Sequence, residues 1–505
     1  MQFFTSEDIM KRFLSIILAL AILIPLAACA GGAEDSQKDA GTGNTPVTQD
    51  PNAIEYEKDD LPALDFEGTK VAVLMGENSL LEADFSVDEL TSDPINDSIY
   101  NREISVEERL GVEIEVFYPD DFSVEVNKQM NAQEDTYQIL GNITFRFSDL
   151  VFTETLADLY EVDYINFDKP WWSQNFIDAA ETDGSLLMAT GSITTSLLRS
   201  LYAVYYNKNL ALDYVESIPE LSDLYGLVES GDWTFDKFIS LGEGLYRDLN
   251  GNSQEDLEDF YGIGLKANIE IDSLFSAFDI TVLSRTEDGW FEFNENGEKL
   301  ISALEMFYDA LYNTKGCFSD NNDENDNWIP EEKYNEFFAG GTLLFNVSRL
   351  YSAESTSLRN MSDEYGVLPF PKYNEAQKEY YSHAHDQYIS FGIPTTNPNA
   401  DIAGAVLEAL ASYSYRETEP TYLDMVLKGR YMSDPQSRKM IDIVVDGFKL
   451  DPAWVYISTI SDSFTNDVRD LLIKGETNYA SFYESSKRTV SRKIKTFHSV
   501  YDSFR

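Results

Sequence analysis

The stretch TKVAVLMG, Thr69–Gly76, has the pattern of a buried strand, because an apolar run is bounded by polar residues and a glycine. A helical pattern follows at 96–110, then a second strand at 111–118, a helix at 122–132 and a third strand from Tyr137. Strands that alternate with helices at these lengths predict right-handed crossovers and a parallel sheet. The predicted fold class is therefore α/β.

Further strand-like runs and helical stretches follow along the chain. Roughly 440 residues come after residue 66, which is too long for one ordinary hydrophobic core. We therefore expect two or three domains. The strand-like runs are 201–207, 261–265, 342–347 and 388–394, and the helical stretches are 234–246, 299–312, 400–415, 434–446 and 483–504.

The N-terminal region, 1–28, has the pattern of a secretory signal peptide. Lys11 and Arg12 precede a short apolar run that ends in small residues. The tripeptide Leu-Ala-Ala before Cys29 resembles the lipobox of bacterial lipoproteins. That resemblance implies cleavage before Cys29 and its modification with diacylglycerol and fatty acyl chains such as palmitate. The alternative is an ordinary signal with a chance cysteine, and Met10 resembles a natural start.

A polar segment, 29–66, separates this signal from the first strand. It is rich in Gly, Ser, Thr, Asn, Asp, Pro and Gln and has few apolar residues. Such a composition cannot bury enough apolar surface to offset the entropy of ordering. We interpret the segment as a disordered tether between the anchor and the folded body.

The charge and cysteine content exclude some partners and chemistries. The chain has 37 Lys and Arg against 89 Asp and Glu, a formal net charge of −52. This balance argues against nucleic-acid binding, because the phosphates would be repelled. Apart from Cys29, only Cys317 remains, so no disulfide can form within the mature chain. We interpret Cys317 as a small structural residue rather than a nucleophile.

Several short motifs carry a resemblance to a known family. They are DGSLLMATG (183–191), LYAVYYNKNL (201–210), GDWTFDKF (231–238), FFAGGTLLFN (337–346), YGVLPFP (365–371) and IPTTNPN (393–399). In residue type and in order, they resemble the motifs of family 1 extracellular solute-binding proteins of ABC importers, the maltose-binding-protein-like group.

The resemblance implies a two-lobed, periplasmic-binding-protein-like fold. Each lobe would be a mostly parallel sheet flanked by helices, with the ligand cleft at the hinge. The solute would be enclosed by a two-state hinge motion. The expected N-lobe is 67–193 with about 388–430, the C-lobe is about 194–387 with 431–505, and the crossings lie near 191–196 and 383–388.

The resemblance also implies a function. We expect a monomeric, lipid-anchored receptor that captures a carbohydrate, in particular an oligosaccharide, and delivers it to the permease subunits of an ABC importer. It would need no cofactor and would lie on the extracellular face of the cytoplasmic membrane of a Gram-positive type bacterium. One alternative is a surface lipoprotein that presents another solute to a sensor. A surface glycan-active enzyme is the other, although the chain has no Walker loop, no G-x-S-x-G and only three histidines.

Candidate ligand contacts are aromatic and polar side chains, because sugars present apolar faces edged by hydroxyl groups. Trp454 and Tyr456 lie where maltose-binding relatives place a stacking aromatic. For the aromatic side chains the alternative is core packing, and for arginine it is a surface position. The aromatic candidates are Trp171, Trp172, Trp233, Tyr380, Tyr381, Trp454 and Tyr456, and the polar candidates just past strands are Asn142, Arg146, Asn346 and Arg349.

The segment 248–259 resembles an EF-hand-like calcium loop. Its oxygen-bearing residues alternate as calcium coordination requires. It departs from that pattern in having Ser253 at the glycine position and aspartate in place of the final glutamate. We predict a structural calcium site, with a solvated acidic turn as the alternative. The candidate ligands are Asp248, Asn250, Asn252, Gln254 through its carbonyl group, Asp256 and Asp259.

Overall fold

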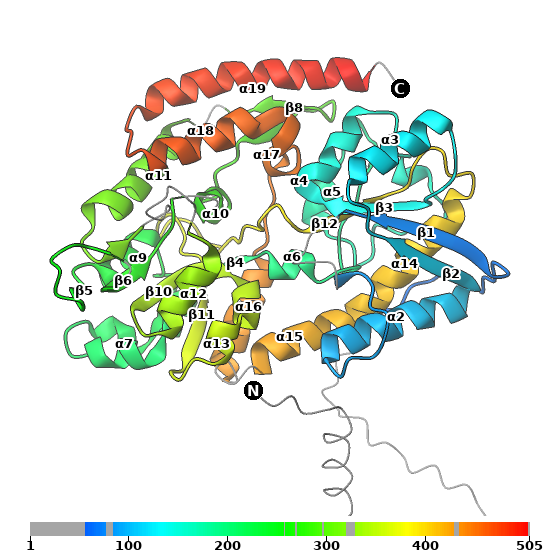
Figure 1. Cartoon of the computed structure of the whole chain (residues 1–505). Helices are drawn as coiled ribbons and strands as arrows, with labels where there is room; N and C mark the ends of the chain where they lie inside the picture. The colour runs from blue at the N-terminus through cyan, green and yellow to red at the C-terminus, as the bar shows by residue number, and fades with distance from the viewer. Residues whose placement is uncertain are drawn as a thin grey trace, which may run out of the picture. The chain divides into compact units, whose positions relative to one another are not determined.

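The computed structural model describes residues 56–502 except 77–83, 257, 268–269, 295–296, 320–328 and 429–433. The predicted signal, Cys29 and most of the predicted tether lie outside these residues. The described part belongs to one compact unit, Tyr56–Arg505. Within it, Figure 1 shows two sheets, each with its own helices, and we call the two parts lobe 1 and lobe 2.

Lobe 1 is built on a sheet with the strand order β12-β3-β1-β2. β1 pairs in parallel with β2 and β3, as the alternation of strands and helices predicts, and the returning strand β12 is antiparallel. The strands are β1 (Thr69–Met75), β2 (Val112–Phe117), β3 (Ile139–Ile143) and β12 (Ile389–Gly392). The helices are α2 (Pro94–Leu110), α3 (Phe122–Ala132), α4 (Thr144–Phe147), α5 (Gln174–Ala180), α14 (Ala400–Arg416) and α15 (Thr418–Lys428), with 3₁₀ turns η2 (Ser148–Phe152) and η3 (Leu159–Glu161).

Local signals set the boundaries of these elements. The Asp93 side chain accepts the Ile95 and Asn96 N–H groups at the start of α2, and Gly111 ends this helix at φ 64°, a left-handed conformation that suits glycine. Val71–Met75 of β1 are all buried, and α2, which packs against β2, is in turn in contact with α14. The predicted helix 96–110 and strand 111–118 are therefore confirmed to within two residues.

Lobe 2 is built on a second sheet, with the order β11-β4-β10-β6-β5 and β9 beside β6. The strands are β4 (Tyr202–Asn207), β5 (Tyr246–Arg247), β6 (Phe260–Gly264), β9 (Cys317–Phe318), β10 (Leu343–Arg349) and β11 (Tyr365–Pro369), and β7 (Leu283–Arg285) pairs with β8 (Phe291–Phe293) in a separate hairpin. The helices are α6 (Ser196–Arg199), α7 (Lys208–Tyr214), α8 (Leu224–Ser230), α9 (Phe235–Gly242), α10 (Glu270–Ala277), α11 (Gly297–Tyr308), α12 (Glu331–Ala339), α13 (Thr356–Arg359), α16 (Pro435–Asp446), α17 (Pro452–Val455), α18 (Asp462–Ile473) and α19 (Tyr479–Tyr501). Four shorter turns complete it: η4 (Pro219–Ser222), η5 (Asp309–Asn313), η6 (Leu350–Glu354) and η7 (Ile457–Ser461).

The strand pairing of lobe 2 corrects the expectation of a mostly parallel sheet. Only β6 pairs in parallel with its neighbours β10 and β9, whereas β4 is antiparallel to both β10 and β11 and β5 is antiparallel to β6. The two-lobed α/β architecture is as predicted, but the second sheet is mixed. β4 enters lobe 2 directly from the crossing out of lobe 1 and runs against both of its neighbours, β10 and β11.

Two chain segments that cross between the lobes lie side by side. Ala189 pairs with Phe391, and Leu201 pairs with Ala384, both antiparallel. The Tyr202 N–H donates to His383 O at 2.9 Å. The crossings expected near 191–196 and 383–388 therefore form one paired connection, and Figure 1 shows the short helix α6 along it.

The folded unit begins earlier than expected. Residues 56–66, assigned to the tether from the sequence, lie on lobe 1: Phe66 N donates to Leu110 O at 2.8 Å, and Asp59 pairs with Arg109. Its few apolar side chains, Leu61, Leu64 and Phe66, also pack against the core. Among the helices that the structure describes, none is long and apolar enough to cross a membrane. Cys317 is a buried free cysteine, and burial raises the pKa of its thiol to about 12, which fits the predicted structural role.

Candidate functional site

The carboxyl ends of the parallel strands in both sheets abut the paired crossing. In lobe 1, Thr144 follows β3, and its N–H donates to Tyr388 O at 2.8 Å. In lobe 2, Leu350 follows β10, and its N–H donates to Leu201 O at 2.8 Å. Open α/β sheets bind ligands in the crevice outside the carboxyl ends of their strands. We call the side chains at these ends, together with the crossing, the strand-end site.

In lobe 1, the strand-end site contains Asn142 and Arg146. Asn142 is nearly buried, and its Oδ1 accepts the Ile143 N–H at 2.8 Å. A Cβ on the neighbouring Gly76 would lie 2.0 Å from this oxygen, so the glycine leaves room for the amide. Arg146 is exposed on α4. Both predicted residues therefore lie at the end of β3, with Arg146 open to solvent.

In lobe 2, the predicted Arg349 is paired with an acid. Its Nε donates to Glu331 Oε2 at 2.8 Å, and Ser348 Oγ donates to Oε1 of the same carboxylate at 2.6 Å. Burial would raise the pKa of Glu331, but the charge and hydrogen bonds of Arg349 outweigh it and hold this pKa well below its usual range. Asn346 is fully buried and donates to Asn335 Oδ1 at 3.1 Å. In this conformation both residues therefore hold β10 to the helix α12.

Two more ion pairs lie after the strands of lobe 2. Lys266 follows β6, and its Nζ lies 2.7 Å from Glu270 Oε1. Arg469 pairs with the buried Asp272, with Nε 3.2 Å from Oδ1. The charges at this end of the sheet are thus matched in pairs, which limits the cost of burying them.

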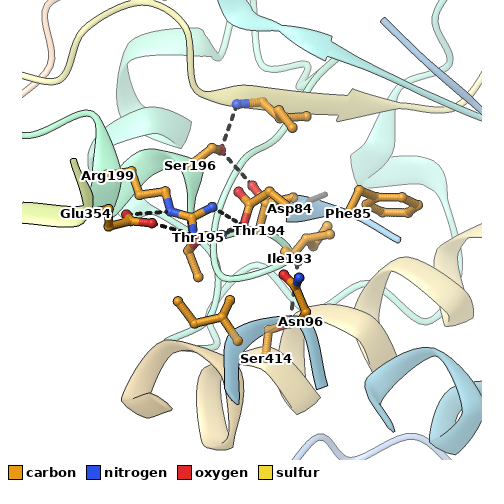
Figure 2. A network of polar contacts seen from close by, with 12 residues as sticks. Asp84, Phe85, Asn96, Ile193, Thr194, Thr195, Ser196, Arg199, Glu354 and Ser414 are labelled. Atoms are coloured by element: carbon orange, nitrogen blue, oxygen red, sulfur yellow. Dashed lines mark hydrogen bonds and ion pairs between the residues drawn. The ribbon is translucent and has the colours of Figure 1, made fainter. Parts of the chain in front are cut away.

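Figure 2 shows a polar network at the hinge helix α6. The Arg199 guanidinium donates to Asp84 Oδ1 at 3.1 Å and to both oxygens of Glu354, at 3.0 and 3.1 Å. Thr195 Oγ1 donates to the same Asp84 oxygen at 2.6 Å. Asp84 comes from the loop after β1 in lobe 1, and Glu354 ends η6 in lobe 2. One cation therefore connects carboxylates of both lobes beside the crossing.

Most of the predicted aromatic ligand contacts lie in the core. Trp172 Nε1 donates to Glu408 Oε2 at 2.8 Å, and Trp233 Nε1 donates to Pro369 O at 2.8 Å. The Trp454 ring packs 4.9 Å from that of Phe275. These residues therefore have packing roles in this conformation, because neighbouring apolar side chains already cover their rings. The aromatic candidates that are at most 2% exposed are Trp171, Trp172, Trp233, Trp454 and Tyr456.

At the start of α17, a pocket of about 280 Å³ lies between the two lobes. Asn175 and Asp178 of α5 line it from lobe 1, and Ser276, Arg285 and Asp451 line it from lobe 2. Asp451 accepts the N–H groups of Val282 at 2.6 Å and of Ala453 at 2.8 Å, and burial raises the pKa of its carboxyl to about 6. The polar groups and the size of this interlobe pocket suit a small hydroxylated solute.

Tyr380 and Tyr381 lie apart from the strand-end site. Both are half-buried and line a pocket of about 720 Å³ formed within lobe 2, between the end of α8, the loop 372–381 and α16. Both tyrosines therefore line a pocket, as a ligand contact would, but this pocket is not the cleft at the hinge.

The predicted calcium loop forms a hydrogen-bonded turn. Asp248 accepts the N–H groups of Gly251 and Ser253, and Asn250 and Asn252 donate their amides to Asp256. Ser253 has φ 62°, the left-handed conformation expected at the glycine position of an EF-hand loop.

The remaining acid of the loop is oriented by other donors. Asp259 is buried and accepts the Leu249 N–H at 3.0 Å and the Tyr246 hydroxyl at 2.9 Å. Among the described residues, no three His, Cys, Asp or Glu side chains are grouped so that they could hold a metal. Carboxylate and amide oxygens are the kind of ligand that calcium prefers. To bind the ion, however, the Asp248 and Asp256 carboxylates would have to give up the N–H donors that they now accept. The calcium site therefore stays a prediction.

Comparison with solved structures identifies the fold. A cyclo/maltodextrin-binding protein complexed with maltotetraose matches at 12% identity and a TM-score of 0.51, over 87% of this chain and 98% of that one. The chain has the fold of ABC solute-binding proteins. A solute-binding protein of an ABC transporter from Thermotoga lettingae, bound with α-D-tagatose, also matches, with a TM-score of 0.50 at 12% identity over 85% of this chain and 100% of that one. The same values hold for the maltose/maltodextrin-binding domain MalE from Bdellovibrio bacteriovorus, bound to maltotriose.

No protein-family model and no curated protein sequence matches the chain. The solved structures with this solute-binding fold are binding proteins rather than enzymes. At this level of identity the comparison establishes the fold, and the ligand must be argued from this chain's own residues.

Several polar residues at the hinge were missed from the sequence. Asp84 and Glu354 occur among many acids, so nothing marks them individually. Arg199 carries a clearer signal, because it is a cation in the largely apolar run between two motifs, next to an expected crossing. Away from the hinge, Lys372 of lobe 2 was also missed, because in the sequence it is an ordinary lysine between Pro371 and Tyr373.

Proposed function

We propose that this chain is a lipid-anchored extracellular receptor that captures a carbohydrate between its lobes and delivers it to an ABC permease. One observation carries the proposal: two α/β lobes are joined by a paired crossing, and strand ends of both sheets are hydrogen-bonded to it through Thr144–Tyr388 and Leu350–Leu201. Such a connection permits hinge closure around a solute. Three proteins with this fold have been solved with tagatose, maltotriose and maltotetraose bound.

The groups around the hinge support a hydroxylated solute. Asn142, Asn175 and Ser276 offer amide and hydroxyl groups, which can donate to and accept from sugar hydroxyls. The lobe-2 cations at the strand ends, Arg349 and Lys266, are already paired with acids. A neutral sugar can therefore be bound there without breaking an ion pair.

Calorimetric titration of the purified protein with plant, host and bacterial oligosaccharides tests the proposal. We expect binding of at least one sugar, a decrease in radius of gyration on binding, and recovery of the sugar unchanged. Release of new reducing ends would replace the receptor by a glycan-active enzyme. Binding only of non-carbohydrate solutes would favour the sensor-type lipoprotein.

Anchoring at Cys29 needs a separate test. Cells that express the chain would be labelled with a palmitate analogue, and we expect label on the wild-type protein but not on Cys29→Ser. A secreted, unlabelled wild-type protein would contradict the lipid anchor and leave the binding function intact.

A further inference from the structure

The pocket of about 720 Å³ in lobe 2 lies within one lobe, away from the paired crossing. We call it the lobe-2 pocket. The loop that forms its floor is held by backbone contacts, with Phe235 N donating to Lys372 O at 2.9 Å and Lys372 N donating to Trp233 O at 3.3 Å. On the α16 side, Ser382 N donates to Gly447 O at 2.8 Å. These contacts leave the pocket preformed, so it does not depend on hinge closure.

Lys372 is the unusual residue of this pocket. It is 3% exposed, yet its ammonium group makes no hydrogen bond or ion pair with any residue in the described part of the chain. The nearest features are the Tyr380 ring, whose centroid is 5.3 Å from Nζ, and Gly231, where a Cβ would lie 3.1 Å from Nζ. The buried part of the residue is its apolar stem, whereas the ammonium group lines the pocket. An occupant that supplies oxygen acceptors can therefore receive hydrogen bonds from Nζ without displacing a protein partner.

The rest of the lining indicates what kind of occupant fits. Tyr380 and Tyr381 both line the pocket, and rings of this kind pack against the apolar faces of sugars. The charged residues of the lining nearly balance, since three lysines face four carboxylates, and Lys439 is paired with Glu229 at 2.8 Å. An anionic ligand would be repelled by these carboxylates, and a cationic ligand would be repelled by Lys372. An uncharged, hydroxyl-rich molecule would be repelled by neither.

We propose that the lobe-2 pocket is a second carbohydrate site, in which Lys372 Nζ donates hydrogen bonds to sugar hydroxyl oxygens and Tyr380 and Tyr381 pack against the ring. The inference rests on the proposed function in that the ligand is a neutral sugar. The second site differs from the proposed interlobe site in its position, because it lies within lobe 2 alone. A pocket of this volume accommodates a short oligosaccharide.

The test is a calorimetric titration of the purified full chain with maltotriose, xylotriose and cellotriose. The variants are Lys372→Met, which removes the ammonium and keeps the chain length, and Lys128→Met as the control, since Lys128 is an exposed lysine of α3 in lobe 1, outside the pocket. We expect two sites in the wild type. Lys372→Met should weaken one of them by about tenfold or more, as loss of a hydrogen bond from a charged donor does. Lys128→Met should leave both unchanged.

Distinct outcomes separate this inference from the proposed function. One sugar site that Lys372→Met leaves intact would overturn the second site and keep the receptor. No sugar binding by the wild type would overturn both. Lys372-dependent binding of inorganic phosphate without sugar would overturn the carbohydrate assignment. If Lys372→Met does not fold, judged by circular dichroism, Tyr381→Ala replaces it, and the same loss of one site is expected.

Discussion

Arg199 of the hinge helix and Asp84 of the loop after β1 form an ion pair, with Nη1 3.1 Å from Oδ1. The Asp84 side chain is fully buried, and the same guanidinium also holds Glu354 of lobe 2. The pair therefore does more than join two residues: it connects both lobes at the point where the chain crosses between them.

Replacing Arg199 by methionine should destabilise the protein strongly. The change leaves Asp84 and Glu354 close together without a cation, and removal of one partner of a buried pair costs about 3 kcal/mol. Urea unfolding followed by tyrosine and tryptophan fluorescence measures this loss. Lys70→Met is the control, because Lys70 pairs with Glu115 on the exposed surface, and we expect no measurable change for it. Equal effects of the two substitutions would contradict a structural role of the hinge pair.

Glu408 should make stability depend on pH. Burial raises the pKa of its carboxyl to about 7, although the hydrogen bond from Trp172 opposes this. Since the pKa in the folded state exceeds that in the unfolded state, the contribution of Glu408 is complete below pH 4.5 and is lost as pH rises through 7. The free energy of unfolding should fall by about 2–3 kcal/mol between pH 5 and 8 on this account.

Glu408→Gln isolates this contribution. The amide oxygen can still accept from Trp172 Nε1, while the titrating proton is gone. Urea unfolding at several pH values should show a flatter profile for the variant than for the wild type. Parallel profiles for the two proteins would show that Glu408 titrates normally.

Local patterns predict the elements of this fold well, but they do not predict which strands pair. The strand 201–207 and the helix 434–446 match β4 and α16 closely, because each depends on residues near in sequence. β4 pairs with β10, and that pairing joins segments more than a hundred residues apart. No short pattern encodes it, and for this reason the mixed sheet of lobe 2 was missed.

The candidate site shows a similar division. A core indole such as that of Trp233 and an indole that faces a ligand look alike in sequence, so the sequence alone did not separate core positions from ligand contacts. Arg199 at the hinge and Lys372 in the lobe-2 pocket are ordinary cations in the sequence, and they become notable only when the fold encloses their side chains.

The loop 248–259 should bind calcium if its oxygen donors exchange their amide contacts for the ion. Adding calcium to protein treated with a chelator should then raise the melting temperature, as any ligand of the folded state does. In Asp248→Asn with Asp256→Asn, the response should disappear, whereas Asp288→Asn, in an exposed turn outside the loop, should retain it. A melting temperature that is the same in EDTA and in calcium would show that the loop is a solvated turn.

The segment 56–66 should be protected as part of lobe 1. Asp59 is the main contact, because its buried carboxylate receives Arg109 Nη1 at 2.8 Å and its N–H donates to Ser412 Oγ at 3.1 Å. Burial would raise the pKa of Asp59, but the hydrogen bond from Arg109 and its charge lower it, so the pair holds at neutral pH and is lost in acid. Hydrogen exchange should be about tenfold faster across this segment in Asp59→Asn, since one charged hydrogen bond is lost. Glu57→Gln, which alters a more exposed contact to Lys169, should exchange like the wild type. Rapid exchange of 56–66 in the wild type would show that the tether extends to residue 66. It would also show that the Arg109–Asp59 pair does not hold this segment on lobe 1.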